Sequence, residues 1–241
     1  MNPVKYSLII PCYNEKLNLK PLLEAFKARL NRNDFELILV DNGSSDGTAE
    51  ELPRLLPLYD FAKSVKVETN RGYGFGILSG LSGASGEYVG WMHGDLQFDP
   101  GAVSAAAGLI ESAGGGKVFV KGLRRGRPCA DRLFTAAMSV FETLLMGIRL
   151  NDINGQPTLF HRSLLETWTA PPHDFSLDLY AFTAAVRAGF RIIRFDVATF
   201  DRAGGVSSWN GGFADRLGLA WRTMISSMRI RVRPPGPRGF R

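Results

Sequence analysis

The stretch YVGWMHGDLQFDP, residues 88–100, says most about the fold of this chain. Its apolar, strand-like first part stops abruptly at polar side chains spaced two residues apart, which are His93, Asp95, Gln97 and Asp99. Such an ending is typical of the carboxyl edge of an open α/β sheet, where ligands bind, and a carboxylate there suits a hard divalent cation bridging a diphosphate. The same letters could also form an ordinary polar turn into a helix that starts at the Asp-Pro pair.

Three upstream segments repeat this arrangement. The apolar runs YSLIIP, FELILV and VKVET occupy residues 6–11, 35–40 and 65–69, and each leads into turn residues and then a helical pattern. Strands that are apolar on both faces are typical of buried parallel strands in βαβ units. We therefore predict an α/β fold with a mostly parallel, Rossmann-like central sheet flanked by helices. The polar strand ends are expected to line one pocket suited to a nucleotide diphosphate.

The remaining elements follow from periodicity. Helices are predicted at residues 17–30, 48–56, 75–84, 102–113 and 133–147, and further strands at residues 117–122, 158–161 and 192–200. The small residues of ILSGLSGASG, residues 77–86, favour close packing of the third helix on the sheet. We expect a single catalytic domain over residues 1–212, followed by an amphipathic helix and a basic tail over residues 213–241.

Composition sets limits on the class of protein. The chain has 241 residues, 45% of them hydrophobic, and a formal net charge of +6. No apolar stretch approaches the roughly 20 residues that a membrane span needs, and the amino terminus has no signal-peptide pattern. These features predict a cytoplasmic protein, and the two cysteines do not make a disulfide framework. The positive charge comes without a recognition motif for nucleic acid, so no nucleic-acid partner is expected.

Four motifs together identify a family. They are SLIIPCYNE at residues 7–15, ELILVDNGSSDGT at 36–48, NRGYGFGILSGLSGASGEYVGWMHGDLQFDP at 70–100 and FDRAGGVSSWN at 200–210. With these motifs in this order, the chain resembles the family 2 glycosyltransferases with the GT-A fold over roughly residues 5–210. The resemblance is strongest to the branch of dolichol-phosphate mannose synthases and bacterial polyprenyl-phosphate glycosyltransferases.

The resemblance implies a site for a nucleotide-diphosphate sugar and a divalent cation, Mn²⁺ or Mg²⁺. The residues that it assigns to donor binding are Pro11, Tyr13, Glu15, Asp41, Asn70, Gly72, Gly74, His93, Gly94 and Asp95. Asp95 and Gln97 are its metal ligands. The family motif is usually Asp-x-Asp, and His93 stands at the first Asp. An imidazole is a softer ligand, so the site should favour Mn²⁺ over Mg²⁺ if His93 binds the metal; alternatively, His93 only forms hydrogen bonds near the ribose.

Arginines are the candidate ligands of a phosphate-bearing acceptor. The resemblance points to Arg124 and Arg132 near the basic loop at residues 124–127, and to Arg202 in the last motif, with Lys121 as a further candidate. A guanidinium suits bidentate contact with phosphate, although a run of arginines is also common on a solvated surface. Together with Asp95, these three arginines are the expected catalytic residues.

Two later segments have alternative interpretations. In relatives, the polar loop at residues 151–157, with Asp152 and Gln156, closes over the sugar, but these residues would also make a competent turn. Asp174 and Asp178 surround the start of a helix, with Ser176 as its expected N-cap. Either carboxylate could contact the sugar or act as a general base, and helix capping would explain both.

The expected activity is single-step, inverting transfer of a sugar to a polyprenyl phosphate of the dolichyl or undecaprenyl type. A phosphate monoester is already ionised at neutral pH and needs no base, whereas a hydroxyl acceptor does. The chain lacks the Gln-x-x-Arg-Trp and Thr-Glu-Asp motifs of the processive polysaccharide synthases in the family. Two alternatives remain: transfer to a saccharide hydroxyl in glycan assembly, and a nucleotide-sugar-binding subunit with little catalysis.

The carboxyl-terminal segment suggests where the protein acts. Apolar residues recur at helical spacing over residues 213–228, among arginines, and a basic tail follows. Such a stripe packs against a core or lies on an anionic membrane surface. A lipid-phosphate acceptor favours a peripheral position at the cytoplasmic face of a membrane, with a membrane protein as a second candidate partner.

Overall fold

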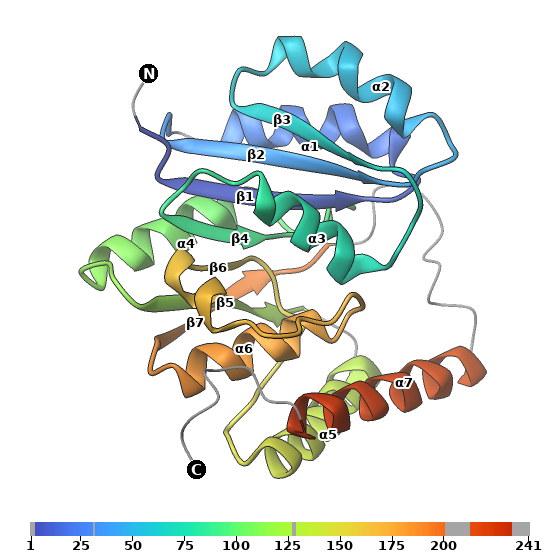
Figure 1. Cartoon of the computed structure of the whole chain (residues 1–241), viewed down its shortest axis with the longest axis vertical. Helices are drawn as coiled ribbons and strands as arrows, with labels where there is room; N and C mark the ends of the chain where they lie inside the picture. Colours follow the sequence, from blue (N-terminus) through green and yellow to red (C-terminus); the bar gives the residue numbers. More distant parts are fainter. Residues whose placement is uncertain (1–2, 31, 127–128, 201–212, 233–241) are drawn as a thin grey trace.

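The four apolar runs form neighbouring strands of one sheet in a computed structural model of the chain (Figure 1). The structure describes residues 3–30, 32–126, 129–200 and 213–232. Within them the sheet has seven strands, in the order β3, β2, β1, β4, β6, β5, β7. The strands are β1 (Tyr6–Cys12), β2 (Phe35–Asn42), β3 (Ala62–Val67), β4 (Tyr88–Trp91), β5 (Val118–Arg125), β6 (Thr158–His161) and β7 (Arg191–Ala198). Only β6 runs antiparallel to its neighbours, so the predicted, mostly parallel α/β sheet is confirmed.

Helices cover both faces of the sheet (Figure 1). They are α1 (Lys16–Arg29), α2 (Thr48–Leu55), α3 (Tyr73–Ser82), α4 (Gly101–Ser112), α5 (Cys129–Met146), α6 (Leu177–Arg187) and α7 (Phe213–Val232), with short 3₁₀ helices at Leu56–Leu58 (η1) and Arg162–Thr167 (η2). Within the described residues, no helix is both long and apolar enough to cross a membrane.

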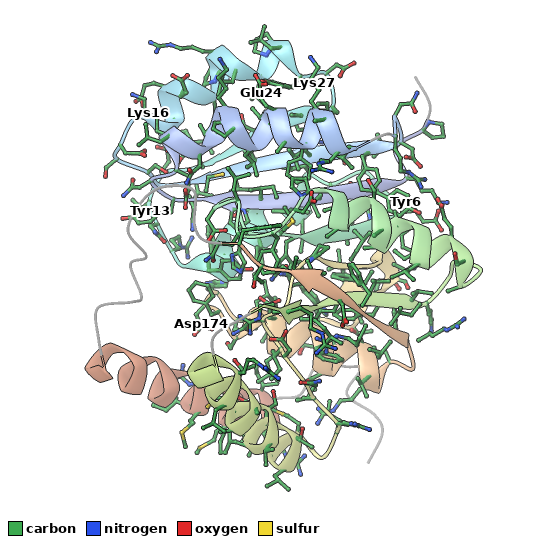
Figure 2. All side chains as sticks on the ribbon, turned by 180° about the vertical axis from the view of Figure 1, so that it is seen from behind. Tyr6, Tyr13, Lys16, Glu24, Lys27 and Asp174 are labelled. Carbon is green, nitrogen blue, oxygen red and sulfur yellow. The ribbon has the colours of Figure 1, made fainter. Side chains whose placement is uncertain are left out.

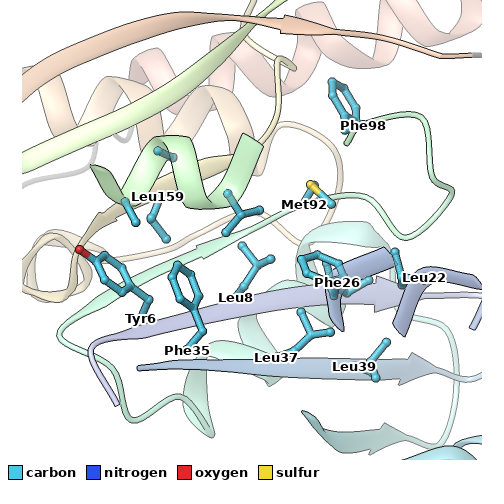
Figure 3. Close-up of a cluster of buried hydrophobic side chains, with 14 of the residues drawn as sticks. Tyr6, Leu8, Leu22, Phe26, Phe35, Leu37, Leu39, Met92, Phe98 and Leu159 are labelled. Atoms are coloured by element: carbon cyan, nitrogen blue, oxygen red, sulfur yellow. The ribbon is translucent and has the colours of Figure 1, made fainter. Parts of the chain in front are cut away.

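Alternation along the strands divides the core between the two faces. On β1, Leu8 and Ile10 pack with side chains of α1, α2 and α4, whereas Ile9 packs with those of α3 and α6. Figure 3 shows part of the first cluster, including Leu8 and Phe26. Because successive strand residues point to opposite faces, a strand buried on both sides must be apolar throughout, as the sequence indicated.

Helix α3 lies unusually close to the sheet because of its small residues. A Cβ atom added at Gly80 would stand 2.6 Å from a methyl carbon of Ile9 and 2.9 Å from one of Val40. This confirms the packing predicted from residues 77–86. Near the start of α3, a Cβ added at Gly76 would stand 3.2 Å from the Asn42 side chain and 3.5 Å from Pro11, which places this end of the helix against the carboxyl ends of β1 and β2.

Strand β5 is longer than predicted. Arg124 and Arg125 continue the strand, paired with Val197 and Ala198 of β7, where the sequence had suggested a basic loop. The Arg125 carbonyl accepts the Thr199 amide over 3.3 Å, whereas the Arg124 amide donates to the Asp152 carboxylate over 2.7 Å. Strand alternation then separates the two arginines: the Arg124 side chain is 17% exposed and the Arg125 side chain 63%.

Candidate functional site

The loops that follow β1 and β2 are joined by hydrogen bonds at the carboxyl edge of the sheet. Cys12 and Asp41 are register partners at the ends of these strands. The Asn14 amide donates to the Ser44 hydroxyl over 3.0 Å, and the Ser45 amide donates to the Asn14 side-chain oxygen over 2.8 Å. Asp41 is buried and accepts from the Ser44 amide over 3.1 Å.

The donor-binding residues predicted on these two loops share that edge. Pro11 and Tyr13 flank the end of β1, Glu15 precedes α1, and Asp41 lies at the end of β2. Figure 2 shows Tyr13 at this edge and Tyr6 at the opposite one. The Tyr13 side chain is 45% exposed, so its ring is available to a ligand.

The loop after β3 is fixed against the first two. The Asn42 side chain donates to the Gly72 carbonyl over 3.0 Å, and the Gly72 amide donates to the side chain of Asn70 over 2.9 Å. Gly72 has a φ of 105°, and a Cβ added there would stand 2.4 Å from the carbonyl oxygen of His173. A Cβ at Gly74 would stand 2.5 Å from that of Pro172. The glycines predicted to let a nucleotide approach therefore admit another segment of the same chain.

Asp95 lies in the loop after β4, where the sequence placed the metal site. The carboxylate is 9% exposed and accepts the backbone amide of Gln97 over 3.2 Å. A Cβ added at Gly94 would stand 2.9 Å from Ile10, so this loop sits directly over the end of β1. Phe200 donates to the Gln97 carbonyl over 2.9 Å, which joins the loop to the chain just before the segment of Arg202. Arg202 itself lies outside the described residues.

His93 belongs to a group of stacked aromatic rings. Its ring centroid is 5.2 Å from that of Tyr73 and 6.1 Å from that of Phe98, and Tyr73 in turn stacks on Phe175 at 4.4 Å. Burial lowers the pKa of His93, although the charges of Asp95 and Asp178 oppose this shift. The imidazole is therefore neutral at pH 7, the form in which a histidine binds a metal or accepts a hydrogen bond.

The metal-binding side chains around Asp95 suit a cation that a bound diphosphate would also coordinate. Within the described residues, no group of three or more His, Cys, Asp and Glu side chains is placed to hold a metal alone. Mg²⁺ typically uses one or two carboxylates and completes its shell with substrate phosphates and water. The Asp95 carboxylate and the Gln97 amide oxygen could serve in that way, with His93 as the softer third candidate.

A buried ion pair joins β5 and α6. Lys121 of β5 and Asp178 of α6 have side chains that are 0% and 2% exposed, with the ammonium 2.7 Å from the carboxylate. Lys121 also donates to the hydroxyl of Thr158 over 2.7 Å. Asp178 accepts from the indole of Trp91 over 3.3 Å and from Gln156 over 3.2 Å. Burial lowers the pKa of Lys121, and the charge of Asp178 opposes that shift.

Tyr73 connects the ion pair with His93. Its hydroxyl lies 3.4 Å from the side-chain nitrogen of Gln156. Burial, followed by the charge of Asp178, raises the pKa of Tyr73 well above the usual value for a tyrosine. The hydroxyl is therefore protonated at neutral pH.

A second ion pair fixes Arg124. Its Nε donates to Asp152 over 2.8 Å, and its backbone amide donates to the other carboxylate oxygen over 2.7 Å. Burial raises the pKa of Asp152, but Arg124 outweighs it and the net pKa is lowered. Arg194 donates to the backbone carbonyls of Asp152 and Gly122 over 3.1 and 2.9 Å. Arg132, in contrast, is exposed on α5.

Two expectations from the sequence need correction. Asp178 is not a capping residue, since its carboxylate points into the buried cluster. Ser176 makes no side-chain cap; instead, Asp174 accepts the Ser176 amide over 2.9 Å and its hydroxyl as well. Gln156 is fully buried and belongs to the cluster.

The sequence analysis missed Trp91, Thr158 and Arg194 as parts of this site. One signal was available for the cluster as a whole. Lys121 occupies an apolar strand, VFVKG, and a lysine buried there requires a carboxylate partner. The sequence could thus have predicted that Lys121 pairs with an aspartate, but not which one.

Comparison with known proteins identifies the family. The model of the family described as Glycosyl transferase family 2 matches residues 7–167. A dolichol-phosphate mannosyltransferase of Saccharomyces cerevisiae is 38% identical over 104 residues, which are 42% of this chain and 39% of the relative. A dodecaprenyl-phosphate galacturonate synthase of Rhizobium johnstonii is 26% identical over 96% of this chain and 69% of its own length.

An undecaprenyl-phosphate 4-deoxy-4-formamido-L-arabinose transferase of Aeromonas hydrophila is 30% identical over 66% of this chain and 50% of the relative. The chain thus spans half or less of the yeast and Aeromonas relatives.

Solved structures share the fold. Glucosyl-3-phosphoglycerate synthase of Mycobacterium tuberculosis, in complex with Mn²⁺, UDP and glucosyl-3-phosphoglycerate, superposes with a TM-score of 0.72 at 20% identity, covering 96% of this chain and 81% of that one. A mannosyltransferase of Pyrobaculum calidifontis, in complex with GDP-Man and Mn²⁺, gives 0.70 at 21% identity, covering 98% and 67%. The fold is therefore GT-A, and by the match over most of its length this chain belongs to glycosyl transferase family 2.

Proposed function

We propose that this chain transfers a sugar from a nucleotide-diphosphate sugar to a polyprenyl phosphate, with inversion at the anomeric carbon and with a divalent metal ion. The names of the relatives support a polyprenyl-phosphate acceptor, and the strand-end loops support a nucleotide donor. In the reaction, an oxygen of the acceptor phosphate bonds to the anomeric carbon as the bond to the donor diphosphate breaks. The nucleoside diphosphate leaves with the bonding electron pair.

The observation that carries this proposal is the engagement of both candidate bases. Asp178 is paired with Lys121 at 2.7 Å and accepts two further hydrogen bonds. Asp174 accepts from Ser176 at the start of α6 and from Ser226 of α7 over 3.3 Å. A general base for a hydroxyl acceptor must be able to take up its proton. Asp178 is buried and paired with an ammonium group, and Asp174 is exposed but held by two serines; an ionised phosphate acceptor needs neither as a base.

The arginines supply the acceptor site in this proposal. Asp152 fixes the orientation of Arg124 by accepting from its Nε and from its backbone amide. The edge of the guanidinium that carries Nε faces Asp152. We propose that the rest of the group lies near the diphosphate site. Arg132 and Arg202 remain further candidates, the first from its exposed position on α5.

The donor is held by the three strand-end loops and by Asp95. We propose that Pro11, Tyr13 and Asp41 contact the nucleoside, and that Asp95 and Gln97 hold the metal. When bound, the metal neutralises charge on the diphosphate leaving group. The lipid acceptor places the reaction at a membrane, and we propose a peripheral position at its cytoplasmic face.

The test is turnover with labelled UDP- and GDP-sugars, Mn²⁺ and a short-chain polyprenyl phosphate, followed by release of nucleoside diphosphate and mass spectrometry of the lipid product. Arg124→Ala should reduce kcat/KM by a factor equivalent to about 2 kcal/mol, because a charge-assisted contact is lost. Lys at this position should restore little, since it cannot reproduce the bidentate fork.

Arg125→Ala is the matched control, because Arg125 is the next residue of the same strand and pairs with Asp196 at the surface. Its kinetics should match those of the parent chain. Transfer to a free saccharide with no transfer to the lipid phosphate would contradict the proposal. Donor binding without transfer to any acceptor would instead favour a binding subunit.

A further inference from the structure

Helix α5 turns three large apolar side chains away from the protein, although Met146 at its end is buried in the core. Leu133, Val140 and Leu144 are 74%, 60% and 79% exposed. Their spacing of seven and four residues places them on one face of the helix. Ala136 and Ala137 are exposed as well. A surface helix of a soluble protein normally has the opposite arrangement, with its apolar stripe toward the core.

Two polar residues of α5 are buried, and their hydrogen bonds fix the rotation of the helix. Ser139 and Glu142 are 7% and 1% exposed. The Ser139 hydroxyl accepts the Asp152 amide over 3.3 Å, and Glu142 accepts from the Ser227 hydroxyl of α7 over 2.5 Å. The Thr143 hydroxyl accepts the backbone amide of Leu150 over 3.0 Å. Rotating the helix to turn the apolar stripe inward would break these contacts.

Helix α7, which packs beside α5, repeats the pattern (Figure 1). Met228 and Val232 are 50% and 79% exposed. Ser226 and Ser227 are buried, with hydrogen bonds to Asp174 and Glu142. We use the name outer apolar surface for the exposed apolar residues of both helices, namely Leu133, Val140, Leu144, Met228 and Val232.

The exposed charges that the structure describes on α5 and α7 are of one sign. Among the described side chains of α5 and α7, Arg132, Arg229 and Arg231 are exposed, and Arg149 is exposed just after α5. The acidic side chain described on these helices, Glu142, is buried. Apolar residues between arginines complement a bilayer with anionic headgroups. A second copy of the chain would bring arginines toward arginines.

We infer that the outer apolar surface docks this chain on an anionic lipid bilayer, with α5 lying in the plane of the interface. Helix α5 connects the strand of Arg124 with Asp152, the partner of Arg124, and Ser139 binds the Asp152 backbone. Docking would therefore bring the proposed phosphate site to the depth of lipid headgroups. The inference rests on the proposed function for its lipid acceptor, but the docking itself can be measured without turnover.

The experiment is co-sedimentation of the full chain with vesicles of phosphatidylcholine alone or of equal parts phosphatidylcholine and phosphatidylglycerol. The parent chain should bind the mixed vesicles, and less strongly at high salt. Leu144→Glu should weaken binding by about tenfold or more, since one apolar contact is lost and a like charge is added. Replacing Arg229 and Arg231 by Gln should weaken binding to the mixed vesicles only.

The matched control is Leu58→Glu, because Leu58 is 65% exposed in η1. This 3₁₀ helix directly follows α2, which lies at the opposite end of the molecule from α5 and α7 (Figure 1). This change should leave vesicle binding unaltered. Equal loss in the Leu58 and Leu144 variants, or no loss in the latter, would overturn the inference. So would a dimer in analytical ultracentrifugation that Leu144→Glu dissociates, combined with no binding of the parent chain to vesicles.

A second readout separates failure of docking from failure of the proposed function. Turnover of a water-soluble acceptor phosphate without vesicle binding would overturn the docking and leave the proposed reaction standing. Vesicle binding that Leu144→Glu abolishes, without turnover of any lipid phosphate, would support the docking and contradict the reaction.

Discussion

At the scale of single residues, the buried ion pair of Lys121 and Asp178 predicts a large effect on the free energy of unfolding. A buried charge whose partner is removed costs about 3–5 kcal/mol, because its desolvation is no longer compensated. We expect Lys121→Met or Asp178→Leu to lower the free energy of unfolding by this amount, measured by urea denaturation. The double variant should be more stable than either single one, because it leaves no uncompensated charge. Additive losses in the double variant would contradict the pairing.

Substitutions at Asp95 and His93 test the proposed metal site. Asp95→Ala should abolish Mn²⁺-dependent binding of a nucleoside diphosphate, measured by calorimetry, because the carboxylate is the hard ligand of the donor set. His93→Asp should shift the preference from Mn²⁺ toward Mg²⁺ if the imidazole binds the ion. An unchanged preference would show that His93 only stacks on its aromatic neighbours. Near-normal binding by Asp95→Ala would move the metal site elsewhere.

At the scale of elements, the loop after β3 depends on a glycine for contact with another segment. Gly72→Ala should destabilise the fold by about 1–3 kcal/mol, since the residue has a positive φ and its new methyl would meet the His173 carbonyl. Gly108→Ala in α4 is the control, because a Cβ there meets nothing within 4 Å. That change should stabilise the chain by about 0.5–1 kcal/mol, as expected for Ala in place of Gly in a helix. Thermal unfolding of both variants tests the contrast.

The contact between α5 and α7 predicts a dependence on pH. Burial raises the pKa of Glu142, and its Oε2 has no hydrogen-bond partner in the part of the chain that the structure describes. The folded chain thus binds the Glu142 proton more tightly than the unfolded chain does. The protonated carboxyl stabilises the fold at pH values below the unfolded pKa, and this stabilisation is lost as the pH rises through the folded pKa.

Glu142→Gln should accordingly raise the free energy of unfolding at pH 7 by about 1 kcal/mol, and change it little at about pH 4, where the carboxyl is protonated. Gln keeps an oxygen for the Ser227 hydroxyl. Chemical denaturation at the two pH values measures the difference, with Glu50→Gln on the exposed surface of α2 as the control. Equal effects at both pH values would contradict a titrating Glu142.

At the scale of the whole molecule, a donor that bridges several loops should stabilise the fold as a unit. The candidate donor site joins loops after β1, β2 and β4, which are far apart in the sequence. A ligand at about 100 times its Kd that binds only the folded state adds about 2.7 kcal/mol. We expect UDP or GDP with Mn²⁺ to raise the Tm, and the Asp95→Ala variant to lose the metal-dependent part. No shift with any nucleoside diphosphate would contradict a donor site at this edge.

The sequence alone determined the fold class and the edge of the sheet that carries the site. Three of the four apolar runs form the buried parallel strands β1, β2 and β4, and the run after residue 64 belongs to β3, a partly exposed edge strand. All four are parallel, and parallel strands place their carboxyl ends together. The positions of Asp41 and Asp95 follow directly from that rule. Strand ends are the part of a site that local pattern specifies, because alternation and turn chemistry act over a few residues.

Only the tertiary structure decided which charged residues form ion pairs. Lys121 and Asp178 are 57 residues apart, and Arg124 and Asp152 are 28 apart, so no local pattern chooses these partners. Pairing with β7 extends β5 through Arg124 and Arg125, which the sequence predicted to lie in a loop. The inward rotation of Ser139 and Glu142 on α5 likewise depends on Asp152 and Ser227. In each case the cost of burying a charge or polar group is met by a distant partner, and the folded chain alone brings that partner into contact.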